Sequence, residues 1–409
     1  MKGSLASEPV VVRLFAAMTA NGPEVMPGGL AISVGKQTQV GQDPVRGRTR
    51  DVWVLGDREA KSSTHQSLWR NTTAVARVQR SQRSLQSRVA DDLFWLGRYA
   101  ERADWTMRVL RSSLLKLLDD DGKLDKSGIV QSPLDPVRVS MGLLLSKSAA
   151  PGSPPVYDLQ NDSIGQLSGL LIHNRACLYA LAPTLDHVVR YAELTRDRLS
   201  FEAWTVLTSL RSGQPWRRLL ESANVETLVD LLEDGLTVIA SFNGLMQENM
   251  TRNHGWTFLS MGRRLERAYN LSDIMLALFQ SPESEEAEWS AMLMLLEVAD
   301  SYITYRSRYR LDPMFPLVVD LLLLDDTNPR SLFFQFEQID RHLASLPLAQ
   351  SPPSQSAKRR LILEAIDELR AIDPIEMAGD PSRNAFRDLL QSKLNMLPEL
   401  SDAIGRRYF

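Results

Sequence analysis

From residue 89 to the C-terminus, apolar residues recur at intervals of three and four, the spacing that lines one face of an α-helix. The first such stretch has its apolar positions between Leu93 and Leu110 and runs into Asp119-Asp120-Asp121-Gly122. Strand patterns are nearly absent beyond residue 60, so we predict an all-α, multi-helix bundle over residues 88–409. Further helices are predicted over 164–182, 185–199, 202–212, 225–250, 256–279, 285–305, 329–344, 358–371 and 383–404.

The first 55 residues follow a different pattern. Short β-rich runs occur at 10–15, 30–34 and 52–55, and Pro27-Gly28-Gly29 predicts a turn. Three short strands cannot enclose a core. We therefore predict a β-containing segment over residues 1–60, a polar linker over 61–87 and the helical domain over 88–409.

Local signals predict where some helices begin and which residues are buried. Asp91 or Asp92 is predicted to cap the first long helix, and Asn328-Pro329 to begin a later one. We expect one continuous helix over 285–305. Its apolar stripe is predicted to face the core and consists of Trp289, Met292, Leu293, Leu296 and Ala299.

One segment of the first long helix is repeated 165 residues later. Phe94-Trp95-Leu96-Gly97-Arg98-Tyr99-Ala100-Glu101-Arg102-Ala103 aligns with Leu259-Ser260-Met261-Gly262-Arg263-Arg264-Leu265-Glu266-Arg267-Ala268. The Gly, the first Arg, the Glu, the second Arg and the final Ala match in register. Because both copies also lie in long helices that follow aromatic residues, we interpret the match as an internal duplication.

The residues of the repeat predict a close, charged crossing of two helices. Glycine inside a helix costs about 1 kcal/mol relative to alanine, which a close helix–helix approach at Gly97 and Gly262 would justify. Arg and Glu three residues apart share a helix face, so Arg98 with Glu101 and Arg263 with Glu266 are predicted to face one another around a pseudo-twofold axis. We favour a buried structural ion network over a site where spare arginines bind a carboxylate or phosphate. Ordinary solvated charge is the third interpretation.

Composition excludes several classes of protein. The 409-residue chain is 44% apolar and 24% charged, which is typical of globular proteins. Cys177 is the single cysteine, which excludes an internal disulfide and a cysteine metal cluster; we predict an inert core thiol and a cytoplasmic location. No apolar run reaches the roughly 20 residues that span a bilayer.

Charge is uneven along the chain. Residues 1–88 carry 13 basic and 6 acidic residues, a net +7 in a chain whose total is −3. We interpret this stretch as a basic, solvated tail, although an acidic or nucleic-acid surface is the alternative. Because the remainder is acidic, we regard nucleic acid as an unlikely partner of the basic aromatic cluster between Tyr302 and Arg310, which contains Arg306 and Arg308.

Known catalytic and metal-binding patterns are absent from the sequence. The five histidines form no His-Glu-x-x-His or Glu-x-x-His pair, and no nucleophile elbow occurs. We predict no catalytic residue, no metal ligand and no cofactor in this chain. The candidate ligand- or partner-binding residues are Arg98, Glu101, Arg102, Arg252, His254, Arg263, Glu266, Arg267, Arg306 and Arg308.

Several separated blocks resemble the alpha-E domain family of bacteria. They are Asp92–Ala103, Arg196-Asp197-Arg198-Leu199-Ser200, Glu248-Asn249-Met250-Thr251-Arg252, Gly255-Trp256, Gly262–Ala268, Tyr302 to Tyr309, Asp320 to Leu324 and Asn328-Pro329-Arg330-Ser331. Together they cover about residues 87–400. About residues 8–55, with Val12-Arg13-Leu14-Phe15, Met26-Pro27-Gly28-Gly29-Leu30-Ala31 and Asp51-Val52-Trp53-Val54-Leu55, are similar to the C-terminal end of the circularly permuted ATP-grasp domain.

The resemblance implies a role beside other proteins. Alpha-E domains are implied to act with circularly permuted ATP-grasp proteins, and with transglutaminase-like proteins, in systems that make or modify peptides. The ATP-grasp-like piece is too short for a nucleotide cleft, so ATP and Mg are expected only in a partner. The leading hypothesis is a non-catalytic helical partner domain. The alternatives are a transferase-type enzyme that binds a carboxylate or acyl-phosphate through its Arg/Glu motifs, and a purely structural scaffold.

Overall fold

The computed structural model describes residues 10–19, 22–33, 49–52, 85–119, 136–147, 164–212, 225–279, 284–346, 353–380 and 382–409. The chain divides into two units, Met1–Gln82 and Arg83–Phe409. The predicted linker lies outside the described residues except for 85–87.

The N-terminal unit contains a three-stranded antiparallel sheet in the order β1 (Val10–Thr19), β2 (Gly22–Ser33), β3 (Thr49–Val52). The prediction of a turn at Pro27-Gly28-Gly29 is wrong. The chain reverses where Thr19 pairs with Gly22, and residues 26–29 lie within β2. The register shifts there, because Leu14 pairs with Gly29 but Ala16 pairs with Val25. Such an irregularity tolerates proline, which cannot donate a ladder hydrogen bond.

Two long helices that run parallel to each other form the centre of the helical unit: α1 (Ser87–Asp119) and α8 (His254–Phe279). They make the most extensive contact between any two helices of the chain's described part. Both carry one copy of the repeated motif, and much of α8 is buried. The predicted all-α bundle is confirmed.

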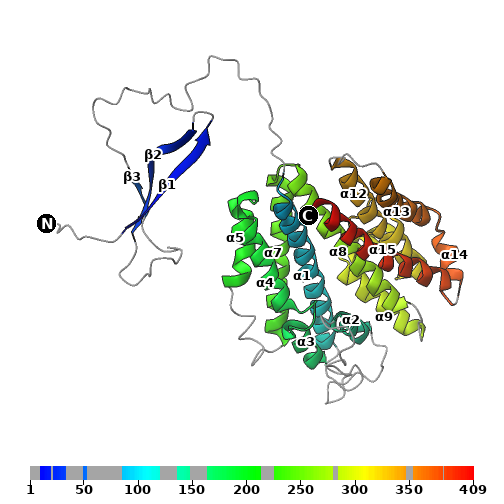
Figure 1. Ribbon diagram of the computed structural model, residues 1–409. Coiled ribbons are helices and arrows are strands. Elements are labelled where there is room, and N and C mark those ends of the chain that lie inside the picture. The colour runs from blue at the N-terminus through cyan, green and yellow to red at the C-terminus, as the bar shows by residue number, and fades with distance from the viewer. Residues whose placement is uncertain are drawn as a thin grey trace, which may run out of the picture. The chain divides into compact units, whose positions relative to one another are not determined.

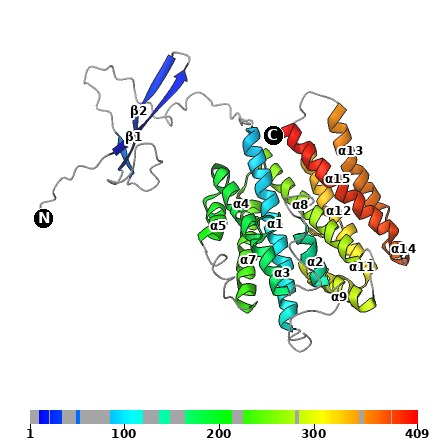
Figure 2. The same ribbon diagram turned by 60° about the horizontal axis from the view of Figure 1, so that its bottom comes forward.

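The other helices surround this pair on two sides (Figures 1 and 2). On one side α4 (Leu181–Leu194) and α7 (Val225–Asn249) pack against α1. Helix α5 (Phe201–Ser212) packs against α4 and α7. On the other side α12 (Leu332–Ser345) and α15 (Asn384–Tyr408) pack against α8, and α13 (Pro353–Arg370) packs on α12.

Shorter elements complete the unit. They are α2 (Pro136–Leu145), α3 (Ile164–His173), the 3-10 turn η1 (Arg196–Arg198), α9 (Glu285–Val298), α10 (Tyr302–Tyr309), α11 (Phe315–Val319), the π-helical turn η3 (Asp320–Leu324) and α14 (Pro374–Gly379). Within the described residues, no helix combines the length and the apolarity that crossing a membrane requires.

Several predicted boundaries are wrong, among them that of the helix expected over 164–182, which ends at His173. Helix α1 begins at Ser87, so Asp91 and Asp92 lie inside it and do not cap it. Ser331 caps α12, because its Oγ accepts a hydrogen bond from the Phe334 amide at 3.0 Å, one turn later than the expected Asn328-Pro329 start. The helix expected over 285–305 is broken after α9, where Asp300 has a φ of 53°.

The helical unit is expected to fold without the N-terminal sheet, since its core is its own. A chain that begins at Arg83 should retain the helical circular-dichroism signal and a cooperative melt. Loss of the helical signal on this deletion would show that the sheet is integral to the bundle.

Candidate functional site: the crossing of α1 and α8

The two glycines of the repeat lie where the backbones of α1 and α8 touch. A methyl group on Gly97 would stand 2.2 Å from the Leu259 carbonyl oxygen, and one on Gly262 would stand 2.1 Å from the Phe94 carbonyl oxygen. Leu259 and Phe94 occupy equivalent positions of the two copies. The contact is therefore reciprocal, as the duplication predicts, and only glycine fits at either position.

Glu266 of α8 receives the arginines of α1. Its carboxylate accepts from Arg102 Nε at 2.7 Å and Arg102 NH2 at 3.2 Å, and it also accepts from Arg98 Nε. The Tyr179 hydroxyl lies 3.0 Å from Glu266 Oε1 and 2.6 Å from the side-chain oxygen of Asn270. Glu266 is fully buried, yet both of its oxygens are bonded.

Glu101 of α1 receives an arginine of α8 in the same way. Arg267 donates to both oxygens of Glu101, with NH2 at 2.8 Å, and its NH1 donates to the Pro329 carbonyl at 3.1 Å. Arg263, the counterpart of Arg98, lies farther away, with its Nε 3.8 Å from Glu101 Oε2. One turn along, Asp104 accepts from Arg108 at 2.9 Å.

The predicted partners therefore differ in one respect from the observed ones. Arg98 pairs with Glu266, and Arg263 approaches Glu101, so each ion pair joins the two helices. Arg and Glu three residues apart lie on the same face of a helix. Because the two helices cross so closely, each arginine pairs with the glutamate of the facing helix and not with the glutamate of its own helix.

Electrostatics hold these carboxylates in the ionised form. Burial opposes ionisation of Glu266, but the guanidiniums of Arg102 and Arg98 outweigh it and lower its pKa to about 2. Burial likewise opposes ionisation of Glu101, whose pKa is nevertheless lowered by Arg267. The stabilisation from Glu266 is complete above its ordinary pKa of 4.5 and is lost as pH falls through about 2.

The remaining candidate residues lie apart from the crossing. Arg252 donates to the Met246 carbonyl at the end of α7 and stacks on Trp256, with 4.3 Å to the ring centroid. His254 is the first residue of α8. Arg308 bonds Asp325 and Thr327, and the exposed Arg306 is 3.9 Å from Asp312.

The basic aromatic cluster does not form a stacking platform. Tyr305 is buried and donates to the Asp312 carbonyl at 3.0 Å. Tyr309 bonds Asp320, and burial together with that hydrogen bond raises its pKa. The thiol of Cys177 is buried as predicted, which raises its pKa.

Sequence reasoning missed several members of the network. Tyr179 and Asn270 complete the Glu266 side, and no signal in the sequence marks them. Asp104 and Arg108 have the i, i+4 spacing of a helical ion pair, which identifies them in retrospect. Arg330 reaches Asp104 at 3.5 Å from the turn before α12.

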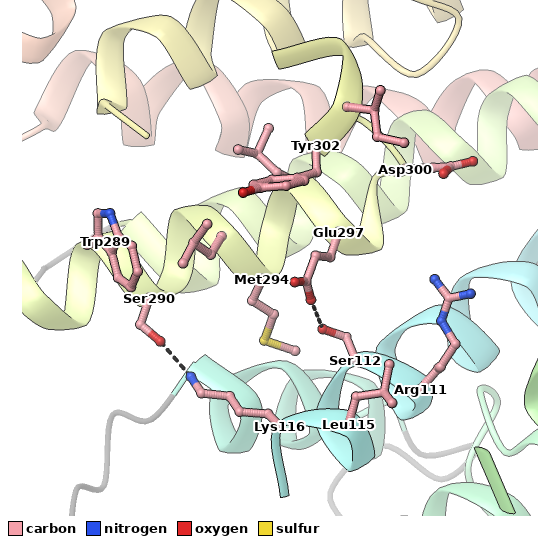
Figure 3. A pocket seen from close by; sticks show the side chains of 13 residues that line it. Arg111, Ser112, Leu115, Lys116, Trp289, Ser290, Met294, Glu297, Asp300 and Tyr302 are labelled. Carbon is pink, nitrogen blue, oxygen red and sulfur yellow. Dashed lines mark hydrogen bonds between the residues drawn. The ribbon is translucent and has the colours of Figure 1, made fainter. Parts of the chain in front are cut away.

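A cavity of about 610 Å³ lies between the C-terminal half of α1 and helices α9 and α10 (Figure 3). Trp289, which we expected in the core, is 47% exposed and lines this cavity with Tyr302 and Ile303. Two hydrogen bonds join α1 to α9 beside the cavity: Ser112 donates to Glu297 at 2.8 Å and Lys116 to Ser290 at 2.5 Å. The prediction that Trp289 faces the core is wrong: it is the first residue of the apolar stripe, and its ring faces this cavity.

Comparison with known proteins identifies the family. Residues 85–409 match the sequence model of the Alpha-E family, which is described as a predicted alpha-helical domain with a conserved ER motif. The chain belongs to the alpha-E family. It contains two Glu-Arg dipeptides, Glu101-Arg102 and Glu266-Arg267, and the structure pairs each with the other.

Two mycobacterial proteins are similar to nearly the whole chain. The uncharacterized proteins Rv2567 of Mycobacterium tuberculosis and Mb2597 of Mycobacterium bovis are each 26% identical over 434 residues. The match covers 98% of this chain and 46% of each relative, so the chain spans about half the length of the curated relatives it matches. No solved structure matches the chain.

The glycine contact is tested by three substitutions. Gly97→Ala and Gly262→Ala should each lower the free energy of unfolding by several kcal/mol, on the order of severe overpacking, because backbone must move away from backbone. Gly244→Ala in α7 is the matched control. A methyl group there meets nothing within 4 Å, so this change should raise stability by about 0.5–1 kcal/mol. Equal effects in urea unfolding would contradict the close crossing.

Proposed function

We propose that this alpha-E domain is a helical partner domain that acts with an ATP-grasp ligase in a peptide-synthesis or peptide-modification system, and that it is not catalytic alone. The main support for the proposal is that both ER motifs are engaged in ion pairs between α1 and α8. The carboxylates of Glu101 and Glu266 are consumed by arginines of the facing helix. A motif engaged in this way stabilises a fold and leaves neither carboxylate for acid–base chemistry.

The exposed apolar wall of the 610 Å³ cavity supports a partner-binding role. Ile303 is 84% exposed, and the half-exposed rings of Trp289 and Tyr302 adjoin it at the same cavity. Adjacent apolar side chains with a polar rim are typical of protein-interaction surfaces. The rim here is provided by Lys116 and Glu297.

The greater length of the relatives supports the proposal that this chain acts together with other protein domains. Because 98% of this chain aligns, the match includes most of the N-terminal unit, and more than half of each relative lies outside it. We propose that an ATP-grasp protein supplies ATP and Mg binding, that a transglutaminase-like protein is a second partner, and that the assembly is cytoplasmic. A single, buried cysteine with no disulfide partner in the chain fits that location.

Binding of the ATP-grasp protein from the same genome tests the proposal. By titration calorimetry with the full chain, we expect a saturable complex that Ile303→Asp weakens at least about tenfold, because a charge enters an apolar contact. Ile375→Asp is the matched control, since Ile375 is 75% exposed on α14 and outside the cavity. Absence of a complex, or equal weakening by both variants, would contradict the proposed function.

A further inference from the structure

The charges on the Glu101 side of the crossing do not balance. Five arginines from α1, α8 and the turn before α12 face three carboxylates, which leaves an excess of two positive charges in this group. The arginines are Arg108, Arg263, Arg264, Arg267 and Arg330, and the carboxylates are Glu101, Asp104 and Asp300.

The strong hydrogen bonds are taken by two of these arginines. Arg267 holds both oxygens of Glu101, and Arg108 holds Asp104 at 2.9 Å. Arg330 reaches Asp104 only at 3.5 Å and Asp300 only at 3.3 Å. Its charge is therefore weakly compensated.

Arg263 and Arg264 donate no hydrogen bond to a carboxylate of the described residues, unlike Arg330. The Nε of Arg263 is buried and has no hydrogen-bond partner, and no described residue accepts from its NH1 or NH2. These terminal groups are not buried, and 18% of the side chain is exposed. Arg264 donates to a neutral acceptor, Gln335 Oε1, at 3.0 Å, and lies over the Phe334 ring.

Arg330 is part of the turn before α12, Arg264 reaches that turn through Gln335, and Arg263 lies close enough to both for their charges to repel one another. Gln335, which accepts from Arg264, donates to the Pro329 carbonyl at 2.9 Å and the Ser331 carbonyl at 2.7 Å. Arg330 lies between those two residues. Burial, and then repulsion from neighbouring arginines, lowers the pKa of Arg264 and Arg330. Ordered cations held together in this way are stabilised by an anion.

In the other half of the duplication, the arginine that corresponds to Arg263 has a bonded carboxylate partner. Arg98, the counterpart of Arg263, bonds Glu266 directly, and Tyr179 adds a further partner to the same carboxylate. At the position of Arg264 the first copy has Tyr99, which stacks on His187 with ring centroids 4.5 Å apart. The second copy thus has a cation where the first has a ring, and lacks the counter-charge that this cation needs.

We propose that Arg263, Arg264 and Arg330 form a binding site for a doubly charged oxyanion, a phosphoryl group. Guanidinium forks bind phosphate oxygens in bidentate pairs, and a phosphate monoester carries about −1.5 to −2 charges near neutral pH, which matches the excess of two. The site goes beyond the proposed function and does not depend on it.

Thermal unfolding and titration calorimetry of the full chain with inorganic phosphate test the site. Phosphate should raise the melting temperature with a saturable dependence, and sodium chloride at matched ionic strength should not. Arg263→Gln and Arg330→Gln should each weaken phosphate binding about tenfold or more, the effect of losing one charge-assisted hydrogen bond. Arg263→Gln removes a charge whose Nε is 3.8 Å from the nearest carboxylate oxygen and donates no hydrogen bond to it, so its melting temperature without phosphate should fall less than that of Arg98→Gln.

Arg98→Gln is the control that the duplication itself provides. It should lower the melting temperature, because it removes a bonded partner of Glu266, and leave the phosphate affinity unchanged. A missing or non-saturable phosphate response, or one that both Arg263→Gln and Arg330→Gln leave intact, would overturn the site. Tighter binding of succinate than of phosphate would overturn the phosphoryl assignment. The chain is tested alone, so failure here is distinct from failure to bind an ATP-grasp protein.

Discussion

The contact between the backbones of α1 and α8 at Gly97 and Gly262 determines how the charges between these helices must be arranged. At this separation water is excluded from the motif, and Glu101 and Glu266 have almost no exposed surface. A buried carboxylate persists in the ionised form only when it is paired and hydrogen-bonded. Each helix therefore has to supply arginines for the other, and the reciprocal pairs follow from the close crossing.

The pairing also organises the surrounding helices. Tyr179, from the turn before α4, joins the Glu266 side, and the Pro329 carbonyl, before α12, joins the Glu101 side. The two flanking groups of helices are thus tied to the same central crossing. The duplication is imperfect, however: both arginines that face Glu266 bond to it directly, whereas the Glu101 side has surplus arginines. We attribute structure to the first half and oxyanion binding to the second.

Much of this arrangement is predictable from the sequence, for physical reasons. Helical periodicity predicts the bundle, and the two interior glycines with Arg and Glu at spacing three predict the crossing. Helix ends are less predictable, because Ser331 and Asn328 are both good caps and only the packed turn selects Ser331. The partner of each charge is not predictable at all, since Arg98 has Glu101 on its own helix yet bonds Glu266 across the interface. The exposure of Trp289 depends in the same way on what packs against α9 in the folded chain, which no local pattern marks.

A double-mutant cycle on Arg102 and Glu266 tests the reciprocal pairing most directly. The free energy of unfolding in urea at neutral pH would be measured for Arg102→Met, Glu266→Gln and the double variant. If the pair is buried and mutually dependent, each single change costs about 3–5 kcal/mol, since it leaves an uncompensated buried group. The double variant should then lose less than the sum by at least about 1.5 kcal/mol. Additivity within about 0.5 kcal/mol would contradict the pairing of α1 with α8 through these charges.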